Sequence, residues 1–218
     1  MIPTYNGILR SHLLNIPACI YECSGICIFG RRIKSLVFST DAVLAVYPFT
    51  PQSSISKAII SVSDAPVFVG VGGGVTSGER SVRLAEEAEH QGAYGVVVNA
   101  PIDPWVISEI KKRIELPVVA TIISEKQDID ERIRAGADIL NIAASRLTPR
   151  VVAHIRADYP EIPIIATGGP TDDSIRETIA AGANAITYTP PTSGTIFSES
   201  MTKYRDKYAK HDETNQNE

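Results

Sequence analysis

Cysteine is scarce in this sequence, and its few residues exclude a disulfide framework. Only Cys19, Cys23 and Cys27 occur, an odd number, and the chain does not start like a secreted protein. Their spacing of four would place three thiols along one face of a helix. However, Gly25 interrupts that helix and no histidine lies nearby, so we interpret the three cysteines as free thiols and not as a metal site.

Long apolar runs and strong charge are also lacking. No run reaches the roughly 18 apolar residues that suggest a membrane span, and the first residues lack the basic start and apolar block of a signal peptide. Lys and Arg total 21 against 25 Asp and Glu, which gives a net charge of -4. This mild acidity argues against broad nucleic-acid or anionic-membrane surfaces. We expect a cytoplasmic protein without nucleic-acid or membrane partners, and leave open a homo-oligomer.

Reactive side chains are few where strands are expected to end. The four histidines fall on predicted helices or tails, and no lysine ends a predicted strand. A histidine metal centre, a Ser-His-Asp triad and a Schiff-base lysine are therefore not supported, and we predict no metal site. The run "GVGGGV" lacks the spacing and context of a dinucleotide fingerprint. It is either a flexible loop beside a ligand or a tight turn.

Short β-branched runs alternate with amphipathic helical patterns along most of the chain. This alternation predicts a parallel sheet, and eight candidate strands in about 200 residues favour an α/β fold of the (β/α)8 TIM-barrel type. The first strand–helix unit is expected to be irregular, because residues 33–49 leave almost nothing between two apparent strands. We predict an N-terminal cover over residues 1–32, a barrel over 33–205 and a polar tail over 206–218. Parallel strands are expected at residues 67–70, 96–99, 118–121, 139–142, 164–167 and 185–188.

An internal repeat supports the barrel. "LPVVATIISEKQDIDERIRAGADILNI" aligns without a gap with "IPIIATGGPTDDSIRETIAAGANAITY", so that Gly136 matches Gly182. Each unit predicts a strand, a helix ending at "AGA" and the next strand, with the glycine at the helix C-terminus. Gly92 repeats the same joint.

Two glycines at the end of the seventh predicted strand suggest an anion site. Gly168 and Gly169 allow close backbone approach, and the loop after the eighth strand offers a helix N-terminus. We predict a phosphate site formed by Gly168, Gly169, Thr189, Ser193 and Gly194. The alternative is a plain turn with Thr171 or Asp172 capping the next helix.

Four polar residues near predicted strand ends are the candidates for catalysis. Asp41 and Glu125 are candidate acids or bases, whereas Asn99 and Asn141 are candidates for orienting a substrate or stabilising an oxyanion. Asp41 and Glu125 are then expected at the same end of the barrel as Gly169. As alternatives, Glu125 lies in the first turn of a helix, and Asn99 only shapes a turn before Pro101.

The residues 162–191, "IPIIATGGPTDDSIRETIAAGANAITYTPP", resemble the closing half of ribulose-phosphate-binding barrels and of FMN-binding barrels such as nitronate monooxygenases. The stretches "RRIKSLVFSTD", "AVYPFTPQ", "VGVGGG", "GVVVNAP" and "ATGGPTDDSI" resemble a poorly characterised family of bacterial TIM-barrel proteins often labelled hydrolases. The first resemblance implies a barrel fold with an anion site and does not identify the substrate. We expect a barrel enzyme that binds a small phosphorylated metabolite. We expect hydrolase, lyase or isomerase chemistry by acids and bases, without a metal or other cofactor. An FMN-dependent oxidoreductase and a non-catalytic sensor of a phosphorylated ligand are the alternatives.

Overall fold

A computed structural model describes residues 18–22, 41–46, 50–169, 171–188, 198 and 201–205. For residues 18–22 and Tyr188 it describes the backbone alone. The chain divides into two units, residues 1–188 and residues 189–218. The second unit contains described helical residues at 198 and 201–205. No helix among the described residues is long and apolar enough to cross a membrane.

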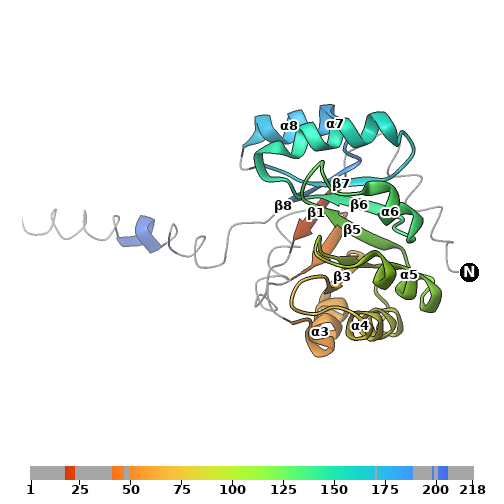
Figure 1. The fold of residues 1–218 in the computed structure, drawn as a ribbon. Helices are drawn as coiled ribbons and strands as arrows, with labels where there is room; N and C mark the ends of the chain where they lie inside the picture. The colour runs from red at the N-terminus through yellow and green to blue at the C-terminus, as the bar shows by residue number, and fades with distance from the viewer. Residues whose placement is uncertain are drawn as a thin grey trace, which may run out of the picture. The chain divides into compact units, whose positions relative to one another are not determined.

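Eight parallel strands form a closed barrel in the first unit (Figure 1). Each strand pairs with the next in sequence, and β8 pairs with β1 to close the ring. The predicted (β/α)8 fold and the six predicted parallel strands are therefore confirmed. The strands are β1 (Ala18–Glu22), β2 (Ala42–Ala45), β3 (Val67–Gly72), β4 (Gly95–Val98), β5 (Val118–Ile122), β6 (Ile139–Ile142), β7 (Ile164–Thr167) and β8 (Ala185–Tyr188).

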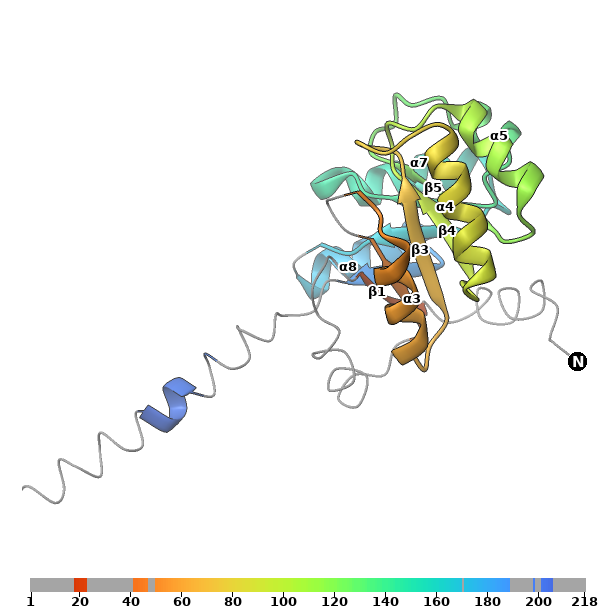
Figure 2. The ribbon, with the colours of Figure 1, turned by 90° about the horizontal axis from the view of Figure 1, so that it is seen from below.

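Helices follow the strands from β2 onward. In Figure 1, α7 and α8 cover one side of the barrel and α3 and α4 the opposite side, while Figure 2 shows α4 alongside β3. Between β1 and β2 the described residues contain no helix, in line with the irregular first unit. The helices are α3 (Ser53–Val62), α4 (Glu79–His90), α5 (Pro104–Arg113), α6 (Ile129–Arg134), the short 3-10 helix η1 (Ser145–Leu147), α7 (Thr148–Asp158) and α8 (Asp172–Ala180).

The barrel starts earlier in the chain than the sequence suggested. Strand β1 lies at Ala18–Glu22, so it belongs to the segment 1–32 that we assigned to a cover, and the predicted boundary at residue 33 is wrong. Cys19 lies in this strand and not in a helix. The helical spacing that would place three thiols on one face therefore does not apply. The first of the two apparent strands within residues 33–49, at residues 35–39, lies outside the described residues, as does the predicted tail 206–218.

The glycines that end the repeated helices adopt the predicted left-handed backbone. Gly92, Gly136 and Gly182 have φ angles of 85°, 109° and 106°. The N–H of Gly136 donates to Ile133 O at 3.0 Å, and that of Gly182 donates to Ile179 O at 2.9 Å. A side chain would be strained at these positions. The "AGA" motif therefore turns each helix into the following strand.

Two separate apolar layers stabilise the barrel. The larger layer lies between the strands and the helices and contains most of the Val and Ile side chains. The smaller layer is made only of alternate strand residues and fills the barrel interior. Side chains alternate along a strand, so the residue two positions further along faces the interior as well. The members of the interior layer are Ala42, Leu44, Phe68, Val97, Val119, Ile139, Ile165 and Ala185.

Candidate active site at the mouth of the barrel

A layer of polar residues lies directly above the apolar layer inside the barrel. Thr121, Asn141, Thr167 and Thr187 each follow a member of the apolar layer by two positions and therefore face the interior. Thr121 pairs in register with Asn141, and Thr167 pairs with Thr187. This layer lies toward the C-terminal ends of the strands, which is the end where TIM barrels hold their active sites.

Asn141 has a buried side-chain atom that is not satisfied within the described part of the polar layer. Its side-chain Nδ2 donates to Thr121 Oγ1 at 3.3 Å, and both residues are buried, with 7% and 6% of their surface exposed. Asn141 Oδ1 is buried and has no hydrogen-bond partner among the described residues. Thr187 differs, because its hydroxyl donates to Ala166 O at 3.4 Å. An unpaired buried acceptor is costly, so Asn141 remains a candidate for contact with a ligand.

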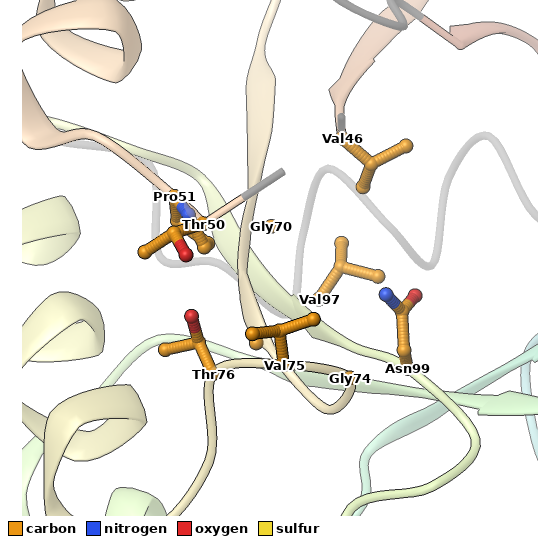
Figure 3. Close-up of a pocket in the computed structure, with 10 residues that line it drawn as sticks. Val46, Thr50, Pro51, Gly70, Gly74, Val75, Thr76, Val97 and Asn99 are labelled. Carbon is orange, nitrogen blue, oxygen red and sulfur yellow. The ribbon is translucent and has the colours of Figure 1, made fainter. Parts of the chain in front are cut away.

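A pocket of about 80 Å³ opens at the C-terminal ends of β2, β3 and β4 (Figure 3). The side-chain oxygens of Thr50 and Thr76 and the amide of Asn99 supply its polar groups, and Val97 lies on its floor. No charged side chain is among its described lining residues. The lining consists of Val46, Thr50, Pro51, Gly70, Gly72, Gly74, Val75, Thr76, Val97 and Asn99.

Glycine creates the space for this pocket. A Cβ atom at Gly70 would lie 3.0 Å from Val46 Cγ1, so a larger residue there would crowd the pocket wall. Gly73 has a φ of 102°, and a Cβ atom on it would lie 2.5 Å from the backbone nitrogen of Asn99. The N–H of Gly73 donates to Thr76 O at 2.7 Å. The glycine run is therefore a tight turn packed against Asn99, and at its tip Val75 is 94% exposed.

Asn99 lies at the mouth, as predicted, and its backbone is held on both sides. Its N–H donates to Gly72 O at 2.9 Å, and its carbonyl oxygen accepts from the N–H of Ile102 at 3.1 Å. It therefore shapes the turn after β4 and also lines the pocket.

Arg132 is a buried residue that sequence reasoning missed. Its Nη2 donates to Ala100 O at 2.6 Å, next to Asn99, whereas its buried Nη1 lacks a partner within the described part of the chain. Burial lowers the pKa of the guanidinium of Arg132 below its usual value. Arg132 thus fastens the loop that presents Asn99. Its place in α6 gave no such signal, because arginines near a helix end are usually solvated.

Glu125 lies at the predicted end of the barrel, in the loop after β5. Helix α6 begins at Ile129 and is capped by Asp128, whose side chain accepts from the N–H of Glu131. Glu125 is therefore not in the first turn of a helix. Its carboxylate accepts from Arg150 Nη2 at 3.0 Å, and both side chains are partly exposed. The pair is open to solvent, so a ligand anion can compete for the arginine.

Asp41 lies at the opposite end, which corrects its predicted catalytic role. Strand β2 begins at Ala42, directly after Asp41, so Asp41 precedes the strand instead of ending it. Parallel strands place this residue at the N-terminal end of the barrel, away from Gly169 and Glu125. Sequence reasoning also missed Glu22, the last residue of β1, whose backbone pairs in register with Leu44. Its segment was not recognised as a strand.

Gly168 and Gly169 lie at the C-terminal end of β7, where the phosphate site was predicted. The N–H of Gly168 is engaged, because it donates to Thr187 O at 3.0 Å. A Cβ atom at Gly168 would lie 2.8 Å from Ile186 Cγ2, and one at Gly169 would lie 2.2 Å from Ser174 Oγ. Thr171 caps α8 through a capping box with Ser174. Close packing thus explains part of the need for glycine. Thr189, Ser193 and Gly194 lie outside the described residues.

These observations define the class of the protein as a TIM barrel with a polar mouth. No protein-family model and no curated protein sequence matches the chain. Among solved structures, it is similar to a phosphoenolpyruvate phosphomutase from Streptomyces platensis subsp. rosaceus, with a TM-score of 0.64 and 16% identity. The alignment covers 95% of this chain and 86% of that chain.

Two further solved structures share the fold. A 2,3-dimethylmalate lyase of the PEP mutase/isocitrate lyase superfamily has a TM-score of 0.67 and 15% identity, over 96% of this chain and 88% of that chain. A phosphonopyruvate hydrolase in complex with oxalate and Mg²⁺ has a TM-score of 0.65 and 15% identity, over 95% and 86% of the two chains. Identities this low show a common fold alone. They do not bear on the resemblance to ribulose-phosphate-binding barrels.

The Mg²⁺ in the phosphonopyruvate hydrolase complex contradicts our prediction that no cofactor is involved, and the FMN alternative receives no support. The described residues of this chain, however, do not fit such an ion. No three of their His, Cys, Asp and Glu side chains gather in a way that could hold a metal, whereas Mg²⁺ prefers carboxylate oxygens. The polar layer and the pocket offer amides and hydroxyls instead. We therefore derive no chemical step through a metal.

Proposed function

We propose that this chain is an enzyme that binds a small phosphorylated or carboxylate metabolite at the C-terminal mouth of the barrel. The observation on which the proposal depends is the polar layer of Thr121, Asn141, Thr167 and Thr187 inside an otherwise apolar barrel. Buried polar groups are retained at a cost, and this layer lies where TIM barrels perform chemistry. The similar solved structures have names that denote a mutase, a lyase and a hydrolase of small acids, which supports this class of substrate.

Each remaining candidate residue has a distinct role in this proposal. Asn99 and Asn141 orient the substrate from the pocket wall and from the barrel interior. Glu125 acts as the acid or base, and Arg150, its partner at 3.0 Å, attracts the substrate anion. The phosphate group is placed at Gly169, because the N–H of Gly168 is already engaged. Hydrolase, lyase and isomerase reactions are all compatible with this set.

Turnover of defined substrates tests the proposal. The purified protein is incubated with phosphonopyruvate and with 2,3-dimethylmalate, each with and without added Mg²⁺, and products are followed by NMR. We expect conversion of at least one compound of this chemical class and a large loss of the rate in Glu125→Gln. Native mass spectrometry of the same preparation identifies a retained ligand. If the protein neither converts nor binds any small phosphorylated or carboxylate compound, the proposal is contradicted.

A non-catalytic sensor of a phosphorylated ligand is the second candidate. It is favoured by the position of Asp41, which leaves Glu125 as the only one of the two proposed acid–base residues at the mouth. A sensor would bind the ligand and be stabilised by it without any conversion. Binding without turnover, unchanged in Glu125→Gln, would favour this function over the enzyme.

A further inference from the structure

Asn141 presents an unpaired polar atom inside the barrel. Only 7% of the surface of Asn141 is exposed, and its Oδ1 has no hydrogen-bond partner among the described residues. Among the described residues, its side chain makes a 3.3 Å hydrogen bond from Nδ2 to Thr121 Oγ1. Below the pair the interior is apolar, with Val119 and Ile139 almost fully buried. A polar group that approaches from the mouth therefore meets Asn141 and Thr121 as the deepest polar contacts on this side of the barrel.

The chemistry of the missing partner follows from the two orientations of the amide. As placed, Asn141 lacks a donor for Oδ1. With the amide turned over, Oδ1 would accept from the hydroxyl of Thr121, and Nδ2 would lack an acceptor. A hydroxyl group both donates and accepts, so it satisfies Asn141 in either orientation. A carboxylate or phosphate oxygen would satisfy only the second orientation.

The absence of cationic side chains from the described interior layers also favours a hydroxyl group over an anion as the partner of Asn141. No Lys or Arg belongs to the described interior layers, and a buried anion without a cation or several donors is strongly disfavoured. We infer that Asn141 and Thr121 form a subsite for a hydroxyl group of the substrate, with the anionic group of the same molecule nearer the rim. The substrate class is thus a small hydroxy acid or a hydroxylated phosphate ester. This inference rests on the proposed function, whose site it deepens.

Pairs of ligands that differ by one hydroxyl test the subsite. Malate and succinate, and glycolate and acetate, are titrated into the full-length protein, and dissociation constants are obtained from the shift of thermal unfolding. Wild type should bind malate at least about tenfold tighter than succinate, because a polar group left unpaired on binding costs this factor or more. In Asn141→Leu the ratio should fall to about one, mainly through weaker malate binding.

Two further variants make the test specific. Thr121→Val keeps the side-chain shape, removes the contact to the amide and should reduce the ratio as well; it also serves where Asn141→Leu does not fold. Thr178→Val is the matched control, because this threonine is also buried but lies on α8, outside the polar layer, where its hydroxyl donates to Ser174 O at 2.8 Å. It should leave the ratio unchanged.

The outcomes separate the two hypotheses. Equal affinities for malate and succinate in wild type, or a ratio that survives in both Asn141→Leu and Thr121→Val, overturn the hydroxyl subsite and leave the proposed function standing. Failure of all four acids and of inorganic phosphate to stabilise wild type contradicts the proposed function, and the subsite with it.

Discussion

At the scale of single residues, Tyr159 has the most perturbed acidity outside the site. Its hydroxyl donates to the carboxylate of Asp130, and this hydrogen bond raises the pKa of Tyr159 from 10.0 to about 12. A raised pKa in the folded state means that the neutral tyrosine stabilises the fold. This contribution is fully present below about pH 10 and is lost as the pH rises through about 12.

Tyrosinate absorbance measures this effect directly. The difference between the titrations of wild type and Tyr159→Phe isolates one of the eight tyrosines, and we expect it to titrate near pH 12. In Asp130→Asn the pKa of Tyr159 should return toward 10, because the negative acceptor is gone. A Tyr159 that titrates at the same pH with and without the Asp130 carboxylate would contradict the assignment.

Gly73 and Gly74 offer a matched comparison at the pocket. Gly73 has a φ of 102°, and a side chain on it would collide with the backbone of Asn99, whereas a Cβ atom at Gly74 would meet nothing within 4 Å. Gly73→Ala should therefore lower the free energy of unfolding by about 1–3 kcal/mol. Gly74→Ala should change it by less than about 1 kcal/mol, and toward higher stability. Urea unfolding of both variants measures these changes. Equal losses of unfolding free energy in the two variants would show that this turn is not packed as described.

At the scale of secondary-structure elements, Gly168 and Gly169 end β7 but differ in their backbone N–H groups. Side chains would crowd Ile186 at the first position and Ser174 at the second, so both Ala variants should be destabilised by about 1–3 kcal/mol. Only Gly169→Ala should also lose the stabilisation by phosphate, because the N–H of Gly168 donates to Thr187 O. Wild type and Gly168→Ala should gain roughly 2.7 kcal/mol at a phosphate concentration a hundred times Kd. Thermal unfolding with phosphate measures this, and equal gains in all three proteins would mean that the glycines only pack.

Elements with strong local signals could be predicted from the sequence. Six strands and the glycine joints at Gly136 and Gly182 follow from β-branched runs and from the need for a left-handed residue. Strand β1 was missed because its segment lies beside cysteines at helical spacing. Asp41 was predicted to follow the C-terminal end of a strand, whereas in the structure β2 begins directly after it. A polar residue beside an apolar run does not show whether it lies at the N-terminal or the C-terminal end of a strand.

The candidate site could be predicted only in part, because some of its features depend on contacts between segments that are distant in the sequence. The positions of Asn99, Glu125 and Asn141 toward the C-terminal end of the barrel could be predicted, because the C-terminal ends of parallel strands meet at one end of a barrel. The pocket depends on contacts between distant segments, such as the approach of Val46 to Gly70, and the sequence does not encode these locally. The orphaned amide oxygen of Asn141 and the buried guanidinium of Arg132 likewise become visible only when their surroundings are known.

At the scale of the whole molecule, the closure of the barrel depends on β1. Ile20 pairs in register with Ala42 of β2 and with Thr187 of β8, so this short strand joins the two edges of the sheet. A proline at Ile20 cannot donate to a neighbouring strand. Ile20→Pro should therefore lower the free energy of unfolding by at least about 1–3 kcal/mol, the cost of a buried acceptor without its donor.

Chemical denaturation of Ile20→Pro beside Ile20→Val checks this closure. The valine variant keeps the backbone N–H and a β-branched side chain, and it should lose no more than about 1.5 kcal/mol. Because β8 carries Thr187 of the polar layer, opening the β1–β8 seam should also weaken ligand-induced stabilisation in the proline variant. If Ile20→Pro were as stable as Ile20→Val, the sheet would be held together without β1. The barrel would then be an open seven-stranded sheet, and its mouth could not be a closed ring of strand ends.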